Sequence, residues 1–118
     1  MSNTSLRIAA EPLRSLGFAS IGSSYVAVGS ALLNPSVMYS LINMTNSDLY
    51  WSWDGVTNNG FLGANGGCLQ YDFTTNKDWR QSGLFASKGL TTYVIVVSGE
   101  TAPSTGSVYL TALYSANV

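Results

Sequence analysis

Short runs of β-forming residues, interrupted by turn-forming residues, restrict this chain to a fold built from strands. Gly, Asn or Pro recurs about every eight to twelve residues, so no segment of useful length carries a helical pattern. Residues 91–97 (TTYVIVV) are almost entirely β-branched, which is typical of a strand covered on both faces. Residues 49–54 (LYWSWD) alternate with a period of two. The pattern predicts an all-β fold, an antiparallel β-sandwich of the jelly-roll or immunoglobulin-like type.

Two turns are expected to join successive strands into hairpins, one around residues 45–48 and one over residues 99–107. Trp51 and Trp53 share one face of their run, and burying the larger apolar surface is favourable. We therefore expect both Trp side chains to point into the sandwich. The residues expected to point outward are Tyr50 and Ser52.

A length of 118 residues fits one domain. Residues 1–15 combine Pro12 with Ser, Asn and charged residues, which favours an extended N-terminal arm ahead of a β-sandwich domain of residues 16–118. The arm is either a frayed end or a segment that becomes ordered on a neighbouring subunit. We expect no signal peptide and no membrane span, because no apolar stretch is long enough for either.

Charged residues are scarce, at 9% of the chain against about 25% in a typical soluble domain. A surface with so little charge favours contact with other proteins, and the alternative is a monomer with a neutral polar surface. The net charge of −1 gives no basic footprint for nucleic acid. No basic amphipathic segment indicates membrane attachment. We therefore expect protein partners, with neither nucleic acid nor membrane among them.

The residue types that most catalytic sites require are missing. The chain has no His, and its single cysteine, Cys68, fits a small half-buried hydrophobe better than an activated thiol. A carboxylate pair for glycoside hydrolysis and a one-acid calcium site are weak alternatives, because Asp residues at strand ends usually accept hydrogen bonds from turn amides. The residues concerned are Asp48, Asp54 and Asp72 for the first site, and Asp54, Asn58 and Asn59 for the second. We expect no enzymatic activity, no cofactor and no metal.

Aromatic residues cluster along the central part of the chain. They could anchor the core and protein interfaces, where Trp and Tyr are enriched, or they could stack on sugars as in carbohydrate-binding modules. The low charge favours core and interface. The residues are Tyr50, Trp51, Trp53, Tyr71 and Trp79.

The segments LINMTNSDLYWSWDGVTNNGFL, LQYDFTTNK, GLFASKGLTTYVIV and GSVYLTALY follow one another in this chain. In motif and order they resemble small β-sandwich virion proteins of tailed bacteriophages. The resemblance covers about residues 41–114 and rests on turns and strands, not on catalytic residues. The segment Lys88-Gly89-Leu90 departs from the pattern, which has a polar residue after the glycine, and residues 17–33 have no counterpart.

The resemblance implies a non-enzymatic structural protein of the bacteriophage virion, made in the cytoplasm of the host bacterium. A capsid decoration, or cement, subunit is the preferred role, and a neck, tail or fibre component is the alternative. A carbohydrate-binding module and a small hydrolase also stay open. The implied partners are the major capsid protein or neighbouring copies of the chain, so we expect a homo-oligomer in the particle. Our candidate interface residues are Arg7, Arg14, Phe61, Leu62 and Trp79.

Overall fold

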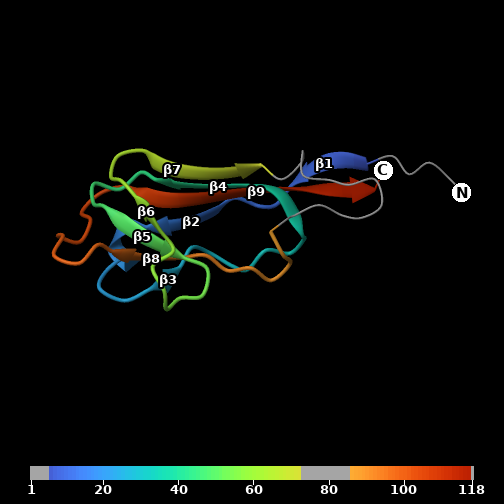
Figure 1. Ribbon diagram of the computed structural model, residues 1–118. Coiled ribbons are helices and arrows are strands. Elements are labelled where there is room, and N and C mark those ends of the chain that lie inside the picture. Colours follow the sequence, from blue (N-terminus) through green and yellow to red (C-terminus); the bar gives the residue numbers. More distant parts are fainter. Residues whose placement is uncertain (1–5, 73–85, 118) are drawn as a thin grey trace, which may run out of the picture.

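The computed structural model describes residues 6–72 and 86–117, which form two antiparallel sheets packed face to face (Figure 1). The larger sheet has five strands in the order β1-β9-β4-β7, with β2 also paired to β9, and the smaller sheet has the order β3-β8-β5-β6. The expected all-β antiparallel sandwich is confirmed. The strands are β1 (Leu6–Ala10), β2 (Arg14–Gly17), β3 (Val26–Ala27), β4 (Ser36–Asn43), β5 (Leu49–Ser52), β6 (Gly60–Leu62), β7 (Gly67–Asp72), β8 (Tyr93–Val96) and β9 (Ser107–Asn117), with a 3-10 turn η1 (Phe18–Ser20) after β2.

Strand β9 is the longest strand and both of its edges are paired. One edge binds β4, and the other binds β2 and then β1 in succession. The segment predicted as an arm, residues 1–15, therefore belongs to the larger sheet from Leu6 onward. Pro12 lies between the two strands, where its missing N–H breaks no ladder. The prediction missed this because the partner strand lies at the other end of the chain.

The two expected hairpins are wrong. Strand β4 lies in the larger sheet and β5 in the smaller, so residues 45–48 carry the chain from one sheet to the other, and residues 99–107 make the reverse crossing from β8 to β9. The two crossings touch, since a Cβ added at Gly106 would lie 2.1 Å from the Met44 carbonyl oxygen. A turn signal indicates where a chain reverses, but it does not identify the strand with which the next run will pair.

Buried polar side chains hold the first crossing in place. The Asn43 Oδ1 accepts hydrogen bonds from the Thr45 amide at 2.9 Å and the Thr45 hydroxyl at 2.6 Å. The Asn43 side-chain amide donates to the Ser47 carbonyl at 2.9 Å. All three residues are buried, so their polar groups need partners inside the protein, and these hydrogen bonds supply them.

The core lies between the sheets and takes alternate residues from their strands. Trp51 is buried as expected, and Trp53 is half-buried against the core, with its indole N–H 3.3 Å from the Tyr39 hydroxyl. Tyr50 is half-buried, and Ser52, expected to face outward, is fully buried. The turn that follows β5 encloses the Ser52 hydroxyl, which donates to Asp54 at 2.7 Å. The buried apolar residues are Ile21, Val28, Leu32, Tyr39, Leu41, Leu49, Trp51, Leu62, Ala86, Val94, Val108, Leu110 and Ala112.

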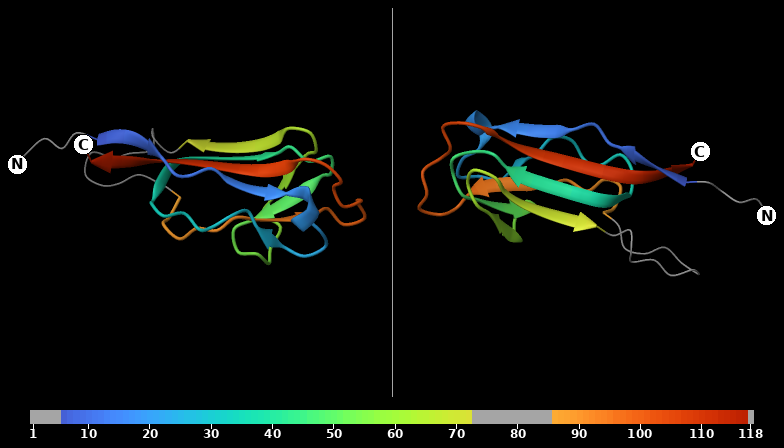
Figure 2. Two further views of the ribbon diagram at one scale, coloured as in Figure 1. Left: turned by 180° about the vertical axis from the view of Figure 1, so that it is seen from behind. Right: turned by 90° about the horizontal axis from the view of Figure 1, so that it is seen from above.

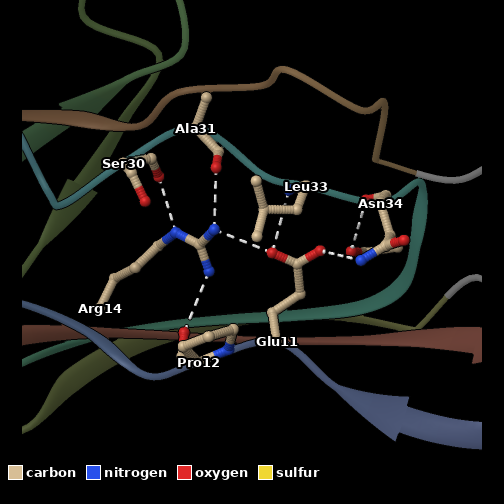
Figure 3. A network of polar contacts seen from close by, with 8 residues as sticks. Glu11, Pro12, Arg14, Ser30, Ala31, Leu33 and Asn34 are labelled. Carbon is tan, nitrogen blue, oxygen red and sulfur yellow. Dashed lines mark hydrogen bonds and ion pairs between the residues drawn. The ribbon is translucent and has the colours of Figure 1, made fainter.

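A buried ion pair lies within the β1–β2 segment, and hydrogen bonds from its two side chains join that segment to the loop ahead of β4 (Figure 3). The Arg14 guanidinium lies 2.8 Å from the Glu11 carboxylate, and both side chains are at most 5% exposed. Arg14 also donates to backbone carbonyls of Ser30 at 2.6 Å, Ala31 at 2.8 Å and Pro12 at 3.0 Å. The charge on this arginine is thus satisfied entirely within the chain.

The Glu11 carboxylate is equally well satisfied. It accepts hydrogen bonds from the Leu33 amide at 3.0 Å and from the Asn34 side chain at 2.8 Å, in addition to Arg14. Burial by itself raises the pKa of Glu11, but these hydrogen bonds outweigh it and hold the pKa below its ordinary value of 4.5. The folded protein therefore stabilises the ionised form.

Removing one partner of this pair should strongly destabilise the fold. Replacing Arg14 with Ala leaves the Glu11 carboxylate buried without its counter-charge, and we expect a loss of about 3–5 kcal/mol in the free energy of unfolding. Urea denaturation followed by tryptophan fluorescence measures it. Arg7→Ala, at an exposed position of β1, is the matched control and should change the free energy by less than about 0.5 kcal/mol. Equal effects of the two substitutions would contradict this role for the pair.

The lowered pKa of Glu11 predicts how this stabilisation depends on pH. A carboxyl whose pKa is lower in the folded state contributes fully above its unfolded value of 4.5, and its contribution is lost as the pH falls through the folded pKa. The difference in unfolding free energy between the wild type and Glu11→Gln should therefore be constant at about pH 6–8 and shrink below about pH 4.5. The other acidic groups contribute equally to the unfolding free energy of both proteins, so their contributions cancel in this difference. A difference that stayed constant on acidification would contradict the prediction.

Candidate interaction surface

Within residues 6–72 and 86–117, no further layer of structure covers the outer face of the larger sheet (Figure 2). Alternate residues of β4 and β9, such as Leu41 and Leu110, are buried in the core. Strand pairing places the intervening residues side by side on the opposite, outer face. In the centre of this face are Met38, Ser40, Ile42, Cys68, Gln70, Tyr109, Thr111 and Leu113. Towards β1 and β2 the same face continues with Ile8, Ala10 and Ser15.

This outer face is almost free of charge. Among its described residues only Asp72, at the end of β7, is acidic, and none is basic. A shallow depression of about 90 Å³ lies at its centre, lined by Met38, Tyr39, Ser40, Gln70, Thr111 and Leu113. Apolar, hydroxyl and amide groups mix there, so the face can exclude water against a partner without desolvating charges.

The five candidate interface residues differ in their exposure in the structure: two are exposed, two are buried and one lies outside the described residues. Arg7 is exposed on β1, and Phe61 is 58% exposed on β6. Arg14 and Leu62 are instead buried within the chain, Arg14 in its ion pair and Leu62 in the core. Phe61 and Leu62 differ in exposure because residues 60–62 form strand β6, in which successive side chains point to opposite faces. Trp79 lies outside the described residues.

The residues of the outer face were missed as candidates, although the sequence contains a signal for them. Residues 37–44 are mostly apolar on both faces of the strand pattern, where a strand with one solvated face should alternate with polar residues. Cys68 also differs from expectation. It is exposed on this face beside Ile42, because β7 is an edge strand and no layer lies above it.

The outer face of the smaller sheet is more aromatic. Tyr50 pairs with Phe61 on one side and Ile95 on the other, and the Tyr50 and Phe61 rings meet edge to face with centroids 6.4 Å apart. The Tyr25 hydroxyl donates to Asn58 in the adjacent loop. Burial and the nearby Asp54 carboxylate raise the pKa of Tyr25 above its ordinary value, so this hydroxyl stays protonated. The aromatic side chains therefore present neutral groups.

Two of the three strand-end carboxylates, Asp54 and Asp48, accept hydrogen bonds from backbone amides, as expected. Asp54 accepts hydrogen bonds from the Thr57 and Val56 amides at 2.8 Å each, and these bonds help to lower its pKa far below the ordinary value. Asp48 accepts from the Ala64 amide at 2.8 Å. The Asp54 carboxylate is thus engaged by the backbone amides of its own turn. Within residues 6–72 and 86–117 no group of three or more acidic or cysteine side chains could hold a metal ion.

No helix in the described part of the chain reaches the length and apolarity that crossing a membrane requires. Comparison of the chain with models of known protein families, with curated proteins and with solved structures finds no match. The surface chemistry of the two sheets and the strand and turn motifs of the sequence are the features that indicate a function.

Proposed function

We propose that this chain is a non-enzymatic structural protein of a bacteriophage virion, acting as a capsid decoration subunit that binds and stabilises the particle through protein contacts. The observation that carries the proposal is the uncovered, almost uncharged outer face of the larger sheet. The resemblance of the strand and turn motifs to small virion proteins supports the setting. A neck, tail or fibre position would use the same surface.

The distribution of charge supports a contact role for this face. Glu11 and Arg14 neutralise each other in the interior, Asp54 accepts hydrogen bonds within its own turn, and Asp48 accepts one from the Ala64 amide. The remaining charged residues of the described chain are spread thinly, so little charge has to be desolvated when the molecule is covered. The centres of protein interfaces are depleted of charge in the same way. The remaining charged residues are Arg7, Asp72, Lys88 and Glu100.

The shape of the face suits a broad contact. A stable protein interface buries roughly 800 Å² on each partner. The five-stranded sheet offers a continuous surface of mostly neutral side chains, which no other described segment covers. The partner on the particle would be the major capsid protein or a neighbouring copy of the chain. Both would present protein surface, so the same variant tests either contact.

A charge placed in the middle of the face should weaken binding without unfolding the chain. Thr111 is exposed on β9 at the centre of the face, and Thr111→Glu would bury an unpaired carboxylate against any partner there. We expect particles prepared without the chain to bind the added wild type in co-sedimentation and to withstand higher temperature when coated. Thr111→Glu should bind roughly tenfold or more weakly, since burying an unpaired charge is costly.

The control makes the same chemical change away from the sheet face. Thr101 is exposed in the crossing between β8 and β9, and its backbone carbonyl accepts a hydrogen bond from the Ser47 hydroxyl, which a change of its side chain leaves in place. Thr101→Glu should bind particles like the wild type. If the wild type did not bind, or if Thr111→Glu bound as well as Thr101→Glu, the decoration role through this face would be wrong.

A carbohydrate-binding module is the second candidate, favoured by the aromatic outer face of the smaller sheet. Exposed Phe61 and half-buried Tyr50 lie beside a loop that contains Asn58 and Asn59, a combination of rings and amides that can receive a neutral sugar. This candidate predicts binding to neutral oligosaccharides on a glycan array that Phe61→Ala abolishes and Thr111→Glu leaves intact. The absence of any binding by the wild type would remove it.

A further inference from the structure

Strand β1 leaves one edge of the larger sheet open. The Glu11 amide donates to the Ala112 carbonyl at 3.0 Å, which fixes the phase of the ladder between β1 and β9. Because hydrogen-bonded pairs alternate in an antiparallel ladder, Arg7 and Ala9 bond to β9, whereas the N–H and C=O groups of Leu6, Ile8 and Ala10 point away from it. No strand among the described residues pairs with these groups.

The β1 edge lacks most of the features by which proteins block edge pairing. Its register with β9 contains no bulge, and its sequence contains no Pro. Its one charge, Arg7, lies on the face opposite to Ile8, and Ile8 is 56% exposed. Strands β3 and β6, at the edges of the smaller sheet, are only two and three residues long, which is itself protective. In both views of Figure 2, β1 lies at the margin of the fold.

We propose that β1 pairs antiparallel with β1 of a second copy of this chain, across a two-fold axis at Ile8. This places Ile8 opposite Ile8 of the second copy and Leu6 opposite Ala10 of the second copy. The outward backbone groups then form about six hydrogen bonds. The two larger sheets become one continuous sheet, and their neutral outer faces join. The inference deepens the proposed function and rests on it for the view that the subunit works beside copies of itself.

The pairing favours a second copy because the strand is complementary to itself. Ile8 is the centre of the five-residue strand, so the two-fold axis uses every outward backbone group on both chains. Arg7 falls opposite Ala9 of the second copy, so the two arginines do not oppose each other. Isologous contacts of this kind are the commonest basis of homodimers.

The first test removes a hydrogen-bond donor from the outward edge. Ile8→Pro deletes an N–H that does not bond to β9, so the subunit should fold, while each dimer loses two hydrogen bonds. Sedimentation equilibrium of the purified wild type should show a concentration-dependent dimer, and Ile8→Pro should weaken it roughly tenfold or more. Ser15→Pro is the matched control. The backbone N–H of Ser15, on β2, also points away from β9. This follows from the hydrogen bond that the Phe18 amide donates to the Gly106 carbonyl, because bonded and non-bonded pairs alternate along the β2–β9 ladder.

The second test reads the register. In a Cys68→Ser background, Ile8→Cys places two thiols in a directly opposed pair with Cα atoms about 5.5 Å apart, within reach of a disulfide. Ala10→Cys places them four residues out of register, about 13 Å apart, which is too far. Mild oxidation should therefore cross-link Ile8→Cys into a dimer and leave Ala10→Cys monomeric.

Three results would overturn the inference: a wild type that stays monomeric at all concentrations, unchanged association of Ile8→Pro, or equal cross-linking of the two cysteine variants. These experiments use the purified chain alone. If the purified chain showed no association through β1 but Thr111→Glu still weakened binding to particles, the β1 pairing would be wrong and the proposed function would be supported.

Discussion

Backbone hydrogen bonding along both edges of β9 is the constraint on which the rest of this structure depends. One edge holds β4, which continues to β7, and the other holds β2 and β1, so the first and last strands of the chain are bound together. The same strand supplies Val108 and Leu110 to the core on one face. On its other face, Tyr109 and Thr111 form the middle of the proposed contact surface. Packing and surface chemistry therefore have a common origin in the register of β9.

The Glu11–Arg14 pair has a consequence for the surface as well as for stability. It lies where the edge of the sheet passes from β1 to β2, and it ties that point to residues 30–34 by hydrogen bonds to backbone and side chain. A chain with few charges thus uses two of them inside, where each has several partners. The outer face of the larger sheet is left with apolar, hydroxyl and amide groups. Because two of the few charged residues are buried in this ion pair, fewer charges remain for the surface, and a surface with little charge suits protein contact.

The sequence predicted the features that depend on local chemistry. Period-two alternation over residues 49–54 predicted strand β5 and the burial of Trp51, and the preference of Asp for turn amides predicted the role of Asp54. Pairing between distant segments was not predictable in this way. The hairpins were wrong because both turns cross between sheets, and the N-terminal arm from Leu6 onward proved to be paired with β9. Arg14 and Leu62 were chosen as interface residues because an isolated charge or apolar residue does not reveal its partner.

The central claim is that the outer face of the larger sheet is covered when the chain is in its assembly. Hydroxyl-radical footprinting of the particle-bound chain against the free chain, read by mass spectrometry, tests it most directly, since Met38, Tyr109 and Leu113 are reactive side chains on that face. The account predicts that these residues lose reactivity in the particle, while Val56 and Phe61, exposed on the other side of the molecule, keep theirs. Unchanged reactivity of the larger sheet, with protection of Phe61 instead, would contradict it.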